Sequence, residues 1–169
     1  IGIVGTGAIG IKIAEIGRAF DCKLIAYSRT IKEEAEKLGV KYVNLDELLK
    51  ESDIVTLHVP LNENTRGLID KEHLSLMKKG SILINTARGP VVDSRDLADA
   101  LNKDHLAGAG VDVFETEPPI PADHPLLHTK NVVLTPHIAF ATKEALERRA
   151  EIVFDNITYW IEGIDKDIC

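Results

Sequence analysis

The sequence predicts an α/β fold, a doubly wound parallel sheet of about seven strands with helices on both faces. Short apolar runs alternate with amphipathic stretches along the whole chain, which is typical of a parallel sheet covered by helices. The chain has 169 residues, 44% of them hydrophobic, enough for one well-buried core and too few for two ordinary domains. We therefore expect a single domain over residues 1–169.

The seven expected strands are the short apolar runs, at residues 1–4, 23–27, 41–43, 54–59, 81–85, 108–113 and 132–135. The expected helices are the amphipathic stretches, at residues 9–20, 31–38, 46–50, 71–78, 94–101 and 142 to about 161. The last helix carries an apolar stripe that we expect to serve in packing, formed by Ala145, Ile152, Val153, Asn156 and Trp160.

A proline-rich stretch at residues 117–125 is expected to be a loop, because proline fixes the backbone and removes hydrogen-bond donors. It follows the sixth strand, on the side where ligands bind in open α/β sheets. A loop in this place can carry a catalytic group.

Composition narrows the function classes. The net charge of −7 disfavours a nucleic-acid partner and favours a small ligand. No apolar run approaches the roughly 18 residues that span a bilayer, and the start of the chain lacks the pattern of a secretory signal. Cys22 and Cys169 lie far apart without metal-ligand spacing, so we expect a cytoplasmic protein with no metal and no membrane contact. The chain opens on a strand without an initiator Met, which suggests a fragment of a larger protein.

A glycine-rich turn, Gly5-Thr6-Gly7-Ala8-Ile9-Gly10, follows the first strand and opens the first helix. The first glycine permits the tight turn, the second lets the backbone approach a pyrophosphate, and the third lets helix and strand pack closely. The helix N-terminus then offers N–H groups to the anion. A P-loop is excluded, because Gly10 is not followed by Lys and then Ser or Thr. We predict a Rossmann-type dinucleotide site in which the three glycines, Ala8 and Ile9 contact the cofactor.

The choice between NAD and NADP depends on the end of the second strand. An acidic residue is expected there in NAD-binding domains, but this chain has Ser28-Arg29-Thr30. Ser and Arg can donate hydrogen bonds to a 2′-phosphate, whereas a carboxylate would repel it. The sequence therefore favours NADPH. The alternative is that Arg29 is a solvated loop charge and that NADH is accepted without a carboxylate partner.

Further segments resemble the D-isomer-specific 2-hydroxyacid dehydrogenases in order and spacing along nearly the whole chain. They are His58-Val59-Pro60-Leu61 with Thr65-Arg66-Gly67, Ile84-Asn85-Thr86-Ala87-Arg88-Gly89, Gly110-Val111-Asp112-Val113-Phe114-Glu115-Thr116-Glu117-Pro118 and Thr135-Pro136-His137-Ile138-Ala139. The resemblance implies an NAD(P)-dependent oxidoreductase domain. It also implies cofactor contacts from His58, Val59, Pro60, Thr65, Thr86, Ala87, Arg88, Asp112, His137 and Ala139.

Reduction of a 2-keto acid requires a cation for the carboxylate, a proton donor beside the carbonyl oxygen, and a bound hydride donor. The resemblance assigns the first task to Arg88, whose planar guanidinium suits two oxygens, and the second to His137. Glu117 would orient the imidazole of His137. The 29-residue spacing from Arg88 selects Glu117 over Glu115 for this role. The alternative is that Glu115 and Glu117 are both ordinary loop acids. Asp112 lies in an apolar run, where an unpaired carboxylate would be costly, so we expect it to have a partner.

In the family, the cofactor domain is inserted in a substrate-binding domain, which this chain lacks, and we expect the full-length protein to be a homodimer. The substrate stays open among glyoxylate, hydroxypyruvate, phosphoglycerate and lactate. A rival interpretation is a non-catalytic dinucleotide sensor, because corepressors related to the family keep the cofactor fold. Formate dehydrogenases are a second rival, but they carry Gln where this chain has Glu117.

Overall fold

The computed structural model describes residues 1–164 and divides into two compact units, Ile1–Pro136 and a second unit that begins at His137. Cys169, the second cysteine of the sequence, lies outside the described residues, and Cys22 is a free thiol. No helix within residues 1–164 combines the length and apolar character needed to cross a membrane.

The first unit is built on a seven-stranded, all-parallel sheet with the order β3-β2-β1-β4-β5-β6-β7. Its strands are β1 Gly2–Val4, β2 Ile25–Tyr27, β3 Lys41–Tyr42, β4 Ile54–Leu57, β5 Ile82–Asn85, β6 Gly108–Val111 and β7 Val132–Leu134. All seven lie within the predicted ranges. β4 and β6 end two residues earlier than predicted, because there the backbone leaves the sheet for loops at its carboxyl edge.

The helices of this unit are α1 Ala8–Ala19, α2 Glu33–Lys37, α3 Leu45–Glu51, α4 Lys71–Leu76 and α5 Ser94–Asn102, with 3-10 helices η1 Gly89–Val91 and η2 Pro125–His128. Side-chain caps fix where three of them begin: Asn44, Asp70 and Asp93 each accept hydrogen bonds from backbone N–H groups of the first turn. The two 3-10 helices were not predicted; each has proline in its first turn, and η2 begins inside the predicted proline-rich loop.

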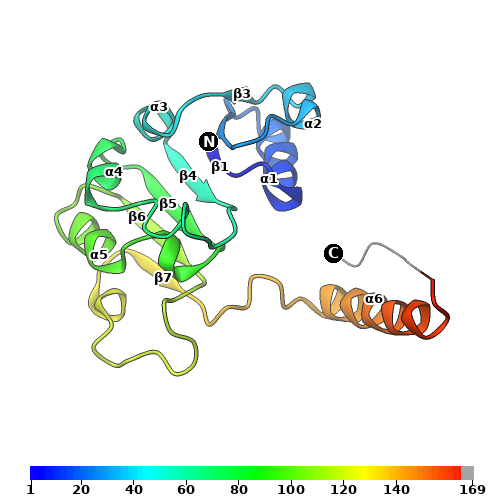
Figure 1. Cartoon of the computed structure of the whole chain (residues 1–169). Helices are drawn as coiled ribbons and strands as arrows, with labels where there is room; N and C mark the ends of the chain where they lie inside the picture. The colour runs from blue at the N-terminus through cyan, green and yellow to red at the C-terminus, as the bar shows by residue number, and fades with distance from the viewer. Residues whose placement is uncertain (165–169) are drawn as a thin grey trace. The chain divides into compact units, whose positions relative to one another are not determined.

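Helices cover both faces of the sheet, as Figure 1 shows for α1 and α2 on one side and α4 and α5 on the other. Successive strand residues point to opposite faces, so Ile3 packs with α1 and α2 while Val4 packs into the larger core. That larger core is formed with α3, α4 and α5 through leucines such as Leu48, Leu74 and Leu97. The two apolar clusters hold the sheet between them.

The strand order reverses direction between β1 and β4. From β1 the chain builds outward to β2 and β3, and from β4 it builds the other way to β7. In doubly wound sheets, ligands bind at the carboxyl ends of the strands beside this switch point. The turn after β1 and the loop after β4 therefore flank the expected ligand crevice.

The second unit contains α6, Lys143–Ile161, which begins at the predicted position with Thr142 as its cap. None of the side chains of α6 is buried within this unit. Trp160 is 77% exposed and Ile152 is 59% exposed.

Candidate functional site

The turn between β1 and α1 has the geometry that its glycines predict. Gly5 has a φ of 96°, in the left-handed region that glycine adopts readily. A Cβ on Gly10 would lie 2.0 Å from the carbonyl oxygen of Gly5, so glycine is needed for α1 to pack this closely on β1. A Cβ on Gly7 would meet no atom of the described residues within 4 Å. Gly7 borders open space at the N-terminus of α1, where a pyrophosphate would approach.

Two cavities follow the carboxyl edge of the sheet, and both are bordered by residues 58–60. The first, of about 250 Å³, also borders residues 5–7, residues 28–30 and Lys32; we call residues 28–32 the ribose loop, after the contact predicted for this segment. The second, of about 440 Å³, also borders Ile9 and residues 86–88. A dinucleotide consists of two nucleosides joined by a pyrophosphate. Two cavities that share a wall beside a glycine-rich turn suit that shape.

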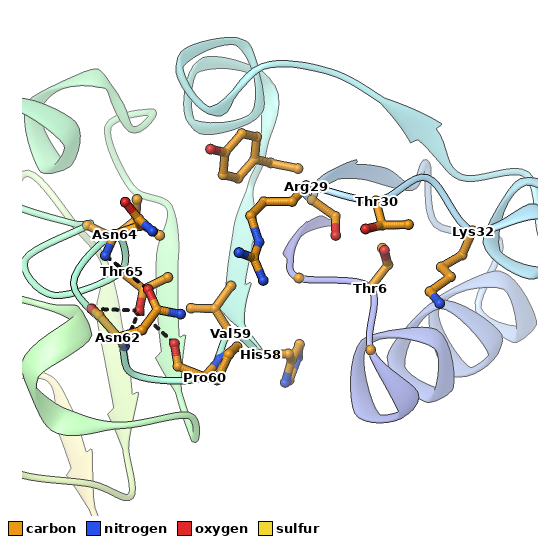
Figure 2. Close-up of a pocket in the computed structure, with 15 residues that line it drawn as sticks. Thr6, Arg29, Thr30, Lys32, His58, Val59, Pro60, Asn62, Asn64 and Thr65 are labelled. Atoms are coloured by element: carbon orange, nitrogen blue, oxygen red, sulfur yellow. Dashed lines mark hydrogen bonds between the residues drawn. The ribbon is translucent and has the colours of Figure 1, made fainter.

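The ribose loop presents polar and basic groups to the first cavity. In Figure 2 the side chain of Arg29 extends into this cavity, with Thr6, Thr30 and Lys32 on one side of it and Val59, Asn62 and Thr65 on the other. Among the described residues that line it, none is a carboxylate. Lys32 was not among the predicted site residues; the available signal was a second basic residue in the same loop.

His58 lies where the two cavities meet. Its Nε2 atom lies 2.9 Å from the hydroxyl oxygen of Thr56, and burial lowers the pKa of the imidazole from 6.5 to about 4. The ring is therefore neutral near pH 7.

Asn85 braces the turn that carries Arg88. This residue ends β5 and is 1% exposed; its side-chain Oδ1 accepts a hydrogen bond from the Ala87 N–H at 3.0 Å, and its Nδ2 donates to the Arg88 carbonyl at 3.1 Å. Arg88 is exposed, and its Nη1 donates to the Ala87 carbonyl at 2.6 Å. Asn85 was not predicted as a site residue, although it lies in the same motif as Arg88.

Gly89 brings two site loops together. A Cβ at this position would lie 2.1 Å from the carbonyl carbon of Phe114 and 2.5 Å from the backbone nitrogen of Glu115. Because glycine has no side chain, the Arg88 turn can contact the start of the loop that carries Glu117.

The acids after β6 have different partners. Asp112 is 3% exposed, and its Oδ1 accepts a hydrogen bond from the Thr135 hydroxyl at 2.5 Å, which confirms the expectation of a partner. Glu115 lies 3.0 Å from Nε2 of His124. The Oε1 atom of Glu117 accepts a hydrogen bond from the Phe114 N–H at 2.6 Å.

The second unit begins at His137, which has a φ of 55°. Its ring meets Phe140 edge to face with centroids 6.0 Å apart, and the guanidinium of Arg149 lies 5.6 Å from the centroid of Phe140. The predicted site residues are thus divided: His137 and Ala139 belong to this unit, and the others to the first. Within residues 1–164, no group of three or more His, Cys, Asp or Glu side chains is arranged to hold a metal ion.

Residues 1–139 match the family model described as D-isomer specific 2-hydroxyacid dehydrogenase, NAD binding domain. The chain is 48% identical over 164 residues to a glyoxylate reductase of Aeropyrum pernix, covering 96% of this chain and 49% of that protein. It is 42% identical over 163 residues to a hydroxypyruvate reductase of Blautia hydrogenotrophica, covering 96% and 50%.

Among solved structures, the chain is similar to D-lactate dehydrogenase from Aquifex aeolicus complexed with NAD and lactic acid. The TM-score is 0.89 at 40% identity, and the match covers 96% of this chain and 53% of that one. The chain thus spans about half the length of the relatives it matches.

Proposed function

Because the chain belongs to the D-isomer specific 2-hydroxyacid dehydrogenases, as their NAD-binding domain, we propose that it is the cofactor-binding part of an enzyme that interconverts 2-keto acids and D-2-hydroxy acids. One observation carries the proposal. The second cavity is bordered both by residues 58–60, which also border the first cavity, and by Arg88. A cation suited to an acid substrate therefore borders the cavity that would take one half of the cofactor.

The residues fit the roles that the reaction needs. When bound, the nicotinamide supplies or accepts a hydride at the carbonyl carbon of the substrate. The guanidinium of Arg88 would hold the substrate carboxylate and carbonyl oxygen in a fixed orientation, because its donors are arranged as a planar fork. His137 would give a proton to the carbonyl oxygen during reduction and remove it during oxidation. Glu117 would orient the imidazole and favour its charged form.

A small, unbranched 2-keto acid is the proposed substrate class. Relatives of 42% to 50% identity are named glyoxylate reductase or hydroxypyruvate reductase, and they support this choice over larger acids. The residues that select the substrate side chain would come largely from a second domain of the full-length protein.

NADPH is the proposed cofactor. The ribose loop offers the hydroxyls of Ser28 and Thr30 and the charges of Arg29 and Lys32 to the first cavity. These groups suit a dianionic 2′-phosphate. The absence of a carboxylate among the described residues that line this cavity supports the same choice.

The change Arg88→Lys in the full-length protein tests the proposed role of Arg88. Lysine keeps the charge but loses the two-point geometry, so kcat/KM for keto acid reduction should fall about a hundredfold while the Kd of NADPH stays within about threefold. Steady-state kinetics and cofactor titration measure the two effects separately. The same change at Arg95, on α5, is the control and should alter neither value. Equal loss of cofactor binding in Arg88→Lys would mean that Arg88 supports the dinucleotide and not the substrate.

A further inference from the structure

Tyr42 joins the two loops that form the first cavity. It lies on the edge strand β3, and its hydroxyl accepts a hydrogen bond from the backbone N–H of Lys32 at 3.0 Å. The same hydroxyl donates to Oγ1 of Thr6 at 3.0 Å. Lys32 ends the ribose loop, and Thr6 lies between Gly5 and Gly7 in the glycine-rich turn after β1, which we call the pyrophosphate turn. One hydroxyl therefore links segments that follow two different strands.

The ribose loop gains little stability from burial, because residues 29–34 are exposed. A hydrogen bond to its last residue is then a direct restraint on where the loop lies. Thr6, in contrast, is 3% exposed and follows the central strand β1. The Tyr42 hydroxyl thus links an exposed loop to a buried residue of the turn after β1.

The direction of the two bonds has a chemical consequence at Thr6. Tyr42 has one hydroxyl hydrogen and donates it to Thr6, so Thr6 serves as the acceptor in that bond. The hydrogen of the Thr6 hydroxyl is then available for donation to another group. Thr6 borders the first cavity, and a phosphate oxygen of a ligand there would be a suitable acceptor.

We propose that Tyr42 is a positioning residue for the dinucleotide, which sets the distance between the pyrophosphate turn and the ribose loop. It acts through Thr6 and Lys32 and does not itself border the cavity. The inference rests on the proposed function, since it assumes that the first cavity takes the adenosine half of the cofactor. It predicts that Tyr42 controls affinity for that half alone.

The test is Tyr42→Phe in the full-length protein, with two probes. ADP-ribose carrying a 2′-phosphate reports on the first cavity, and nicotinamide mononucleotide reports on the second. Loss of the two hydrogen bonds should raise the Kd of the first probe and the KM of NADPH by about three- to thirtyfold. The Kd of the mononucleotide and kcat at saturating NADPH should stay within about twofold, as should all values for the control Tyr159→Phe, which makes the same change on α6.

Variants at Thr6 provide a second, independent readout. Thr6→Ser keeps the hydroxyl and should bind the ADP-ribose probe like the wild type, whereas Thr6→Val should bind it more weakly than Tyr42→Phe, because it loses both the bond to Tyr42 and the hydroxyl that would donate to a phosphate oxygen. The double variant should lose less than the two single losses combined, because both remove the same bond.

Wild-type affinity of Tyr42→Phe for the ADP-ribose probe would overturn the proposal, as would equal weakening of both probes. Specific loss of the ADP-ribose probe in a protein that reduces no keto acid would support the role of Tyr42 while contradicting the proposed function.

Discussion

His58 shows how burial sets the charge of a single side chain that borders both cavities. Its neutral ring lies between the two cavities, because burial lowers its pKa to about 4. Attraction for a pyrophosphate is then left to the N-terminus of α1, and attraction for a 2′-phosphate to Arg29 and Lys32. Within the first cavity, Arg29 and Lys32 are the lining residues that carry positive charge.

Cofactor choice should respond to one side chain, Ser28. The change Ser28→Asp would add an acceptor for the ribose hydroxyls and repel a 2′-phosphate, so the ratio of kcat/KM for NADH to that for NADPH should rise at least about tenfold. Ser28→Asn, which has a similar shape without the charge, is the matched control and should change the ratio much less. Kinetics with both cofactors measure it. A wild-type enzyme that already strongly prefers NADH would show that the interpretation of Arg29 is wrong.

Individual residues differ in how far their surroundings could be predicted. A buried carboxylate needs a partner, so the partner of Asp112 was expected before Thr135 was identified. No such rule pointed to Tyr42, because its contacts with Thr6 and Lys32 depend on how β3 returns beside β2. The role of Asn85 was not predicted for a related reason. Its hydrogen bonds stabilise a turn, and the sequence motif does not show the shape of that turn.

At the level of elements, stability and ligand binding depend on different glycines of the β1–α1 unit. Gly10 holds α1 against the turn after β1, whereas Gly7 faces open space at the start of the helix. The periodicity of the chain located these elements well, because strands and helices here have clear apolar patterns. It located β4 and β6 less well at their ends, where apolar residues continue into the loops of the site.

Alanine at Gly10 should therefore affect stability, whereas alanine at Gly7 should affect cofactor binding. Gly10→Ala places a methyl group 2.0 Å from the Gly5 carbonyl oxygen, so it should lower the free energy of unfolding by about 1–3 kcal/mol or more. Gly7→Ala should leave stability nearly unchanged but weaken NADPH binding at least about tenfold, because its methyl group enters the space that the pyrophosphate needs. Denaturant unfolding and cofactor titration measure the two effects. Normal cofactor binding by Gly7→Ala would contradict this account of the turn.

At the scale of the whole molecule, the strand order of the sheet explains where the two cavities lie. Reversal between β1 and β4 leaves the loops after these strands diverging, and residues 58–60 become the wall shared by both cavities. The alternation of strands and helices predicted this architecture. The roles of His137 and Glu117 followed from family resemblance, because no local pattern assigns a proton donor and its orienting acid across a chain.

The most direct test of the central claim is isotope transfer by the full-length protein. It would be supplied with NADPH carrying deuterium at the transferred position, together with hydroxypyruvate, and the product would be examined by mass spectrometry and chiral separation. The account predicts D-glycerate with one deuterium on the former carbonyl carbon. Tight NADPH binding without transfer of deuterium to hydroxypyruvate or glyoxylate would contradict it and indicate a non-catalytic dinucleotide sensor.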